Sequence, residues 1–182
     1  MDDQKRTEEK IAQCKSLRLP YLDLSHLHLQ TIPESIGQLY WLEALSLSHN
    51  QLTDIEPIAT LKNLHKLAFS DNKITNIDIL KEHTKLKFIF MNENHISNIE
   101  VVKELPKLKK LEAHHNDIKE INSLSSLSGL VYLDLADNHI EDIKPITNIE
   151  TLIWLSLKNN PIDDDIAKKV GHTLKKLAHY VY

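Results

Sequence analysis

Histidines and carboxylates are the residues of this sequence whose types could support metal binding or acid–base chemistry. The chain has 182 residues, of which 11 are histidines and 26 are aspartates or glutamates. Imidazole and carboxylate groups are common ligands of zinc and other transition metals. His114 and His115 are adjacent, and His26, His49 and Asp71 follow one another at intervals of 23 and 22 residues. These two groups are candidate metal ligands if the fold brings their members together.

Other signatures of catalysis are absent from the sequence. The three glycines of the chain, Gly37, Gly129 and Gly171, are too far apart to form a loop that cradles a phosphate. No serine lies in a G-x-S-x-G motif. The single cysteine, Cys14, falls in a segment that we expect to be helical, where a small buried side chain is more common than a nucleophile. We therefore predict no catalytic residue, no enzymatic activity and no cofactor.

Composition and charge argue against several further classes of function. The formal net charge is −4, whereas nucleic-acid-binding proteins usually carry a basic stripe. No apolar run approaches the roughly 18 to 20 residues of a membrane span, and the opening residues MDDQKRTEEK lack the apolar segment of a signal peptide. One cysteine cannot form an internal disulfide. These features predict a cytoplasmic protein that binds neither nucleic acid nor a membrane.

An eleven-residue pattern, L-x-x-[LI]-x-[apolar]-x-x-N-x-[LI], occurs six times at intervals of 22 residues. Its copies are LEALSLSHNQL, LHKLAFSDNKI, LKFIFMNENHI, LKKLEAHHNDI, LVYLDLADNHI and LIWLSLKNNPI, the first of which starts at Leu42. A seventh copy, LPYLDLSHLHL, starts at Leu19 and carries Leu27 in place of the asparagine. A single unit of this length cannot bury its apolar side alone, so the units are expected to stack around one continuous core.

The asparagine of each unit is expected to have a structural role. Its amide can both donate and accept hydrogen bonds, so it can satisfy backbone groups that are freed where each strand ends. The column consists of Asn50, Asn72, Asn94, Asn116, Asn138 and Asn160. In the second half of the third unit, His83 takes a place that leucine or isoleucine fills in the other units, and the sequence offers no reason for it.

These tracts resemble the leucine-rich repeat family over residues 16–162. The period and the D-I-x-P-I segments at residues 54–58 and 142–146 are similar to the 22-residue class of the family, which includes bacterial internalins and the phosphatase-1 regulatory subunit. Residues 8–39 look more like the first repeat of bacterial intracellular leucine-rich repeat proteins. The resemblance implies an α/β fold, a right-handed solenoid with a curved parallel sheet of about seven repeats and short terminal cap helices.

The ends of such a stack need caps, because an open end would expose the core. We predict one domain over residues 1–182, with a cap helix over residues 1–15, seven repeats over residues 16–162 and a second cap helix over residues 163–182. Acids in the first turn of the second helix and lysines further on suit the helix dipole. Its expected apolar face consists of Ile166, Val170, Leu174 and Leu177.

The residues between the apolar positions of each strand are expected to point away from the core, toward the face that is concave in the family. Exposed aromatic side chains ringed by charged residues are typical of protein interfaces. The candidate partner-binding residues are Tyr21, Phe88, Phe90, Lys110, Glu112, Tyr132, Asp134 and Trp154. The histidine groups fall on the same open surface, which gives a metal little enclosure, so we predict no metal site.

We predict a non-catalytic protein–protein interaction module that binds a partner through this face. The partner is expected to be a protein of unknown identity, and the chain a monomer or a weak homodimer. The aromatic side chains could instead be shielded by lysine stems or pack in a dimer. The sequence is also compatible with a homodimerising scaffold, an adhesin, a metal-binding protein, or the repeat portion of a larger intracellular signalling protein, for example one linked to a GTPase.

Overall fold

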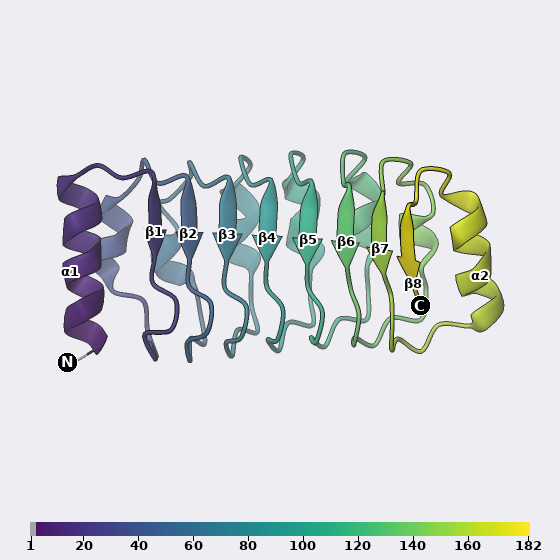
Figure 1. Cartoon of the computed structure of the whole chain (residues 1–182), viewed down its shortest axis with the longest axis horizontal. Helices are drawn as coiled ribbons and strands as arrows, with labels where there is room; N and C mark the ends of the chain where they lie inside the picture. The colour runs from purple at the N-terminus through teal and green to yellow at the C-terminus, as the bar shows by residue number, and fades with distance from the viewer. Residues whose placement is uncertain (1–2) are drawn as a thin grey trace.

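Eight short parallel strands form one sheet in the computed structural model, which describes residues 3–182 apart from the side chains of residues 171 and 172. Each strand pairs with the strands that precede and follow it in the sequence (Figure 1). The strands are β1 (Tyr21–Asp23), β2 (Ala44–Ser46), β3 (Lys66–Ala68), β4 (Phe88–Phe90), β5 (Lys110–Glu112), β6 (Tyr132–Asp134), β7 (Trp154–Ser156) and β8 (His179–Val181). The predicted leucine-rich repeat solenoid is confirmed.

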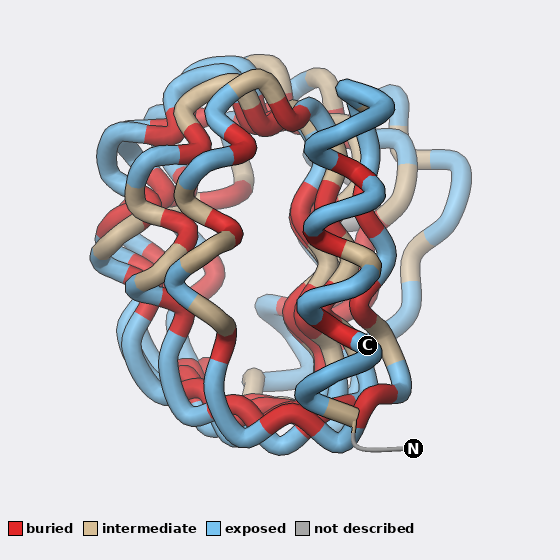
Figure 2. Tube along the Cα trace, turned by 90° about the vertical axis from the view of Figure 1, so that its left-hand side faces the viewer, coloured by how far each residue is buried: buried red, intermediate tan, exposed pale blue. Residues whose placement is uncertain are grey.

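A second layer of short 3-10 helices runs behind the sheet. These are η1 (Glu34–Gln38), η2 (Glu56–Ile58), η3 (Asp78–Glu82), η4 (Glu100–Glu104), η5 (Asn122–Ser126) and η6 (Lys144–Ile146). Buried segments turn toward the space between the two layers, as the view along the stack shows (Figure 2). Each repeat thus contributes apolar side chains from both layers to one continuous cluster, and burial of this cluster is the main stabilising term of the fold.

The asparagine column joins successive repeats as the sequence predicts. The Asn94 side chain accepts a hydrogen bond from the Ile74 N–H at 2.9 Å and donates to the carbonyl oxygens of Phe69 and Met91 at 3.1 and 3.3 Å. The Ile74 N–H and the Phe69 carbonyl oxygen both belong to the preceding repeat. A buried backbone group without a partner is costly, so the column fixes where every strand ends.

The residue before each asparagine, or before Leu27 in the first unit, has a left-handed backbone conformation. Its φ lies between 53° and 58° in all seven repeats, at His26, His49, Asp71, Glu93, His115, Asp137 and Asn159. This conformation is unfavourable for most L-residues and is tolerated best by glycine, asparagine and aspartate. The turn therefore sets the direction of the chain after each strand. Glu93 adopts the left-handed conformation although glutamate is not among the residue types that tolerate it best.

A helix lies at each end of the stack (Figure 1). At the N-terminal end, α1 (Asp3–Ser16) buries Thr7, Ile11 and Cys14. At the C-terminal end, α2 (Asp164–Thr173) begins at the Asp163 cap, whose carboxylate accepts hydrogen bonds from the N–H groups of Asp165 and Ile166. These contacts satisfy donors that a helix start leaves unpaired.

The prediction of a helix over residues 163–182 is wrong for its second half. Residues 179–181 form β8, which pairs with β7 through hydrogen bonds such as Leu157 N–H to Val181 O at 2.7 Å. The predicted apolar face is confirmed at Val170 and Leu174, which are buried, and Leu177 packs against the core; it is wrong at Ile166, which is 42% exposed, whereas Ala167 is buried. The physical reason is that β7 has an edge of unpaired backbone groups, and a strand satisfies them where a longer helix would not.

His83 is fully buried and bridges two repeats. Its Nδ1 lies 3.2 Å from the Ile79 carbonyl oxygen in its own repeat, and its Nε2 lies 3.2 Å from the Ile58 carbonyl oxygen in the preceding one. Burial lowers the pKa of the imidazole, against the opposing effect of these hydrogen bonds. The histidine therefore replaces an apolar contact by a polar link between neighbouring loops.

Candidate functional site

The solvent-facing side of the sheet, here called the strand face, carries the aromatic residues that the sequence singles out. In β4, Ile89 is buried, whereas Phe88 is 39% exposed and Phe90 is partly exposed. Tyr132 and Trp154 are likewise partly exposed, on either side of buried core positions. The side-chain direction predicted for these residues is confirmed, because alternate residues of a strand point to opposite faces.

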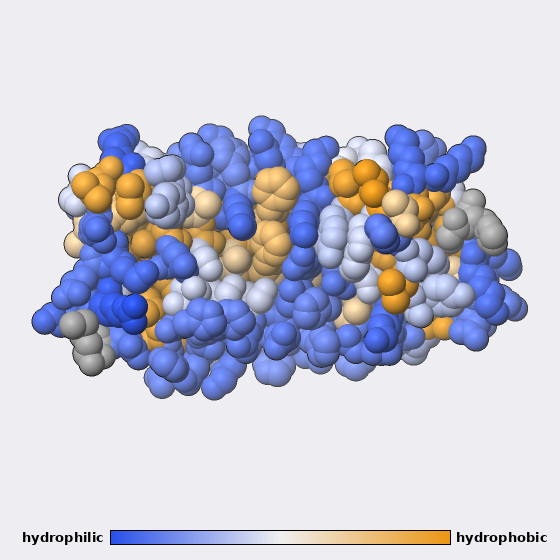
Figure 3. Space-filling view, viewed as in Figure 1, coloured by the Kyte–Doolittle hydropathy of each residue, from blue (hydrophilic) through white to orange (hydrophobic). Residues whose placement is uncertain are grey.

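The register of the sheet arranges these side chains in two rows that run across the strands. One row contains Phe88, Lys110, Tyr132 and Trp154, and the other contains Phe90, Glu112, Asp134 and Ser156. Figure 3 shows a hydrophobic column over the middle of the sheet with hydrophilic residues beside it. We call Phe88, Phe90, Tyr132 and Trp154 the aromatic group, and Glu112 and Asp134 the acid pair.

The Tyr132 and Trp154 rings stack face to face, with centroids 4.2 Å apart and an interplanar angle of 4°. The Lys110 ammonium lies 3.8 Å from the Tyr132 centroid and 5.4 Å from the Phe90 centroid. These cation–π distances hold the lysine between the two rings. Tyr132 therefore has a neighbour on each face, and the position of its ring is fixed in the free protein.

The two members of the acid pair differ in what they contact. Glu112 binds the Lys110 ammonium at 2.8 Å and accepts from the Asn92 amide at 3.2 Å. Asp134 accepts from the Ala136 N–H at 3.2 Å, and it forms no ion pair with any residue of the described chain. Burial is the largest effect on the pKa of Asp134 and raises it, and the Glu112 carboxylate adds to this, whereas the Ala136 N–H, the His114 charge and the Ser156 hydroxyl lower it; the net shift is upward. Asp134 is thus a partly desolvated carboxylate that lacks a counter-ion.

Tyr132 is affected by the same carboxylates. Burial is the main effect that raises the pKa of its phenol to about 12, and the charges of Glu112 and Asp134 add to it. The hydroxyl therefore remains protonated at neutral pH and is able to donate a hydrogen bond. The strand face combines apolar rings, the Tyr132 hydroxyl donor and the Asp134 carboxylate, which has no ion pair, within the four neighbouring strands β4 to β7.

Not every candidate residue belongs to this cluster. Tyr21 is 61% exposed, but it lies in β1, and β2 and β3 separate it from Phe88. Lys66 was not among the candidates predicted from the sequence, yet its ammonium lies 5.2 Å from the Phe90 centroid. Its place two residues after the start of its repeat is the signal that could have found it, because Phe88 and Lys110 occupy the same place in the next two repeats.

The two histidine groups meet as the repeat spacing suggests, but no site of three or more metal ligands forms within residues 3–182. The His26 and His49 rings stack with centroids 4.1 Å apart, and His49 Nδ1 lies 2.9 Å from Asp71. His115 pairs with Asp137 at 3.5 Å. His49 and His115 form solvent-accessible ion pairs of small energetic value, and His26 contributes only a ring stack.

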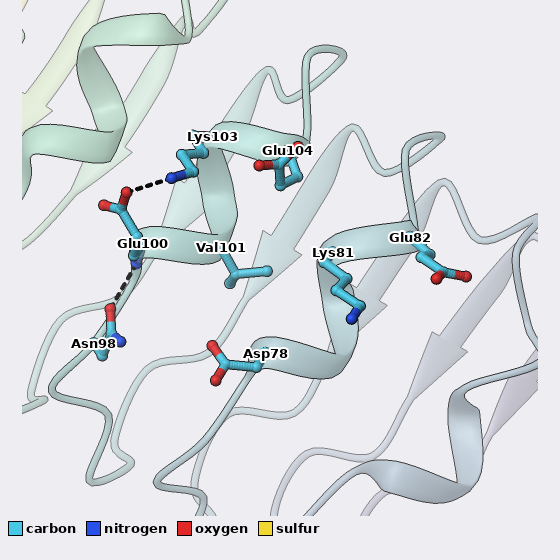
Figure 4. A pocket seen from close by; sticks show the side chains of 8 residues that line it. All are labelled: Asp78, Lys81, Glu82, Asn98, Glu100, Val101, Lys103 and Glu104. Carbon is cyan, nitrogen blue, oxygen red and sulfur yellow. Dashed lines mark hydrogen bonds and ion pairs between the residues drawn. The ribbon is translucent and has the colours of Figure 1, made fainter.

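A depression lies on the opposite side of the molecule, between η3 and η4 (Figure 4). It measures about 540 Å³ and is open to solvent. Its lining is mostly charged, with Lys103 bound to Glu100 at 2.6 Å, and it includes the buried Val101. Ligand sites are usually enclosed and mostly apolar, so this depression lacks the chemistry of a small-molecule site.

Comparison with known proteins agrees with the repeat architecture. The family profile described as Leucine Rich repeats (2 copies) matches residues 41–82 and 106–148. The chain contains leucine-rich repeats over these residues and has the fold of leucine-rich repeat proteins. No curated protein matches the sequence at a significant level. Leucine-rich repeats are commonly protein-binding modules, so binding of a protein is the general function that this fold supports.

Several solved structures share the leucine-rich repeat fold of this chain. An internalin (inlF) of Listeria monocytogenes is 26% identical with a TM-score of 0.74, over 85% of this chain and 52% of the internalin. Internalin C2 (inlC2) of the same organism is 25% identical with a TM-score of 0.75, over 96% of this chain and 89% of internalin C2. A leucine-rich repeat protein of Leptospira interrogans is 25% identical with a TM-score of 0.77, over 84% of this chain and 40% of the Leptospira protein. The chain thus spans about half of the inlF internalin.

Within residues 3–182, no helix is long and apolar enough to span a membrane.

Proposed function

We propose that this leucine-rich repeat protein is a non-catalytic binding module that holds a protein partner on its strand face. The aromatic group, Phe88, Phe90, Tyr132 and Trp154, supplies the apolar contacts, and Lys110 and the acid pair supply polarity. The observation that carries the proposal is the preformed stack of Tyr132 on Trp154, with Lys110 on the other side of the tyrosine ring.

Order in the free protein lowers the cost of binding at this surface. Binding costs free energy when interface side chains lose rotamer freedom, and that cost is about 0.5 to 1.5 kcal/mol for each mobile side chain. The Tyr132 ring is confined between Lys110 and Trp154, and Lys110 is itself held by Glu112 at 2.8 Å. Much of this cost is therefore met when the chain folds, which favours binding at this place on the surface.

Domain organisation and location belong to the same proposal. We place the whole sequence in one domain, because a single buried cluster extends from Ile11 in α1 to Leu174 after α2. We place the protein in the cytoplasm, because Cys14 has no second cysteine with which to form a disulfide. Tyr21 lies apart from the aromatic group, so we assign it at most to the edge of the interface.

The test is an affinity capture from a lysate of the native organism, read by mass spectrometry. Wild type is compared with a Phe90→Ala, Trp154→Ala variant, and circular dichroism verifies that the variant is folded. The matched control is Tyr40→Ala, which removes a 56% exposed aromatic ring outside the strand face. Both wild type and the control should capture the same protein, and the double variant should lose it.

The affinity of the captured partner gives the quantitative check. Alanine at an interface hot spot costs about 2 kcal/mol or more, which is roughly a 30-fold loss of affinity. A double variant that binds as tightly as wild type would exclude the aromatic group as the binding site. If neither protein captures anything, the molar mass of wild type in solution decides whether the strand face binds a second copy of the chain.

A further inference from the structure

Some charged side chains of the strand face have an ion-pair partner and others do not, and this difference points to the chemistry of the partner. Lys110 and Glu112 neutralise each other at 2.8 Å. Asp134 lies beside this pair in the register of the sheet and forms no ion pair within the described chain. A basic group that acts on its carboxylate is the His114 imidazole, which is charged only when protonated. Glu93, at the turn after β4, is exposed and also has no ion pair within residues 3–182. The aromatic group is therefore bordered by carboxylates without counter-ions.

The surroundings of Asp134 suit a cation that arrives from outside. The carboxylate lies on β6, two residues after Tyr132, whose ring stacks on Trp154 in β7. Partial burial makes an unpaired charge unfavourable, so a cation that pairs with Asp134 would remove an existing penalty as well as form a new contact. An arginine fork has the geometry to bind a carboxylate with two hydrogen bonds and to lie against an aromatic ring.

Resting on the proposed function, we infer that the partner presents a cationic segment in which an arginine or lysine binds Asp134 and adjacent apolar side chains contact the aromatic group. Three of the residues that would make these contacts, Tyr132, Asp134 and Trp154, lie on two neighbouring strands. Phe88 and Phe90 lie on β4, on the far side of Lys110, and contact the other end of the segment. The segment thus runs across the strands from β7 toward β4.

Charge complementarity selects this occupant over an acidic segment or a second copy of the chain. Among the outward residues of β4 to β7 and the turns that follow them, Glu93, Glu112, Asp134 and Asp137 outnumber Lys110 and Lys158. Like charges placed opposite each other cost free energy, and a partner with a basic segment avoids that cost. A second copy of the chain would present the same carboxylates, and its own net charge is −4.

The test uses a displayed library of random twelve-residue peptides as the probe. Peptides are selected on wild type and depleted on the folded Phe90→Ala, Trp154→Ala variant, so that those retained depend on the aromatic group. We expect the retained peptides to be rich in arginine and lysine next to apolar residues. A synthetic copy of one of them should bind Asp134→Asn at least roughly tenfold more weakly than wild type. The asparagine keeps an oxygen that can accept from the Ala136 N–H, which protects the fold.

The control is Asp78→Asn, which makes the same change of charge at an exposed position on η3, behind the sheet. Its affinity for the peptide should equal that of wild type. Peptides that depend on the aromatic group but are neutral or acidic, or that bind Asp134→Asn as tightly as wild type, would overturn the inference and leave the proposed function standing. A library without any peptide that depends on the aromatic group would also overturn the inference, and the lysate capture would then judge the proposed function separately.

Discussion

The buried histidine of the third repeat should make the stability of the protein depend on pH. In the folded chain, burial lowers the pKa of His83, whereas the unfolded chain has the ordinary value of about 6.5. Between these two pKa values the unfolded chain binds a proton that the folded chain does not. The free energy of unfolding therefore decreases as the pH falls below about 6.5, by at most about 1.4 kcal/mol per pH unit for this one proton.

The perturbation that isolates this effect is His83→Leu, because leucine or isoleucine fills the same place in the other repeats, for example Leu61 and Leu105. Full burial of a leucine side chain contributes about 2 kcal/mol, and loss of the single hydrogen bond that a neutral imidazole can donate costs about 1 kcal/mol. The Ile58 carbonyl oxygen still accepts from the Leu61 N–H at 2.8 Å. We expect the variant to be more stable by about 1 kcal/mol at neutral pH, and by more in acid.

The assay is urea unfolding followed by circular dichroism at several values between about pH 7 and about pH 5, where histidines titrate. Charges near His83 are the exposed Lys62 and Glu82, which pair at 3.0 Å and have opposite effects on its pKa. The control is His139→Gln, which removes an exposed imidazole. The reasoning is refuted if the difference in unfolding free energy between His83→Leu and wild type stays constant over this pH range.

Three further predictions concern the asparagine column, the left-handed turns and the tyrosines. Asn94→Ala should destabilise the protein by about 3 kcal/mol in urea unfolding, because it leaves the buried Ile74 N–H and three carbonyl oxygens without the amide. A loss under about 1 kcal/mol would contradict this. Glu93→Gly should stabilise by about 0.5 to 1 kcal/mol, since φ is 53° there, and a lower thermal midpoint would speak against strain at this turn. In an ultraviolet absorbance titration, Tyr132 and Tyr180 should ionise near pH 12, later than an ordinary phenol; Tyr132→Phe should remove one of the two late transitions, and an unchanged curve would show that the assignment is wrong.

The strand face shows what sequence periodicity can predict about a site. The position of each outward side chain in its repeat predicts its face, because a strand alternates sides and each repeat contacts mainly its neighbours. The same periodicity places Phe88, Lys110, Tyr132 and Trp154 in one row, as the register of the sheet confirms. It could not show that Lys110 occupies the gap between two rings, because side-chain rotamers depend on packing across three strands.

The C-terminal strand shows where periodicity fails. Its tract, LAHYVY, starts at Leu177 and has Tyr180 and Tyr182 where the other repeats have leucine or another apolar residue. The interval from the preceding strand is also longer than 22 residues, because α2 lies between them. A tract with two large tyrosines at an irregular interval is as compatible with the end of a helix as with a strand. The Tyr180 hydroxyl donates to the Ala167 carbonyl oxygen at 2.9 Å, a contact that only the folded chain reveals.

The sequence by itself determined the repeat, the identity of the core, the asparagine column and the face on which the aromatic group lies. All four follow from period and alternation, which are local properties of a chain that stacks unit on unit. The tertiary structure alone decided that His83 links two repeats, that Asp134 lacks a counter-ion while Glu112 has one, and that Tyr132 is confined between Lys110 and Trp154. These outcomes depend on distances between side chains of different repeats, and such distances are set by packing rather than by spacing along the chain.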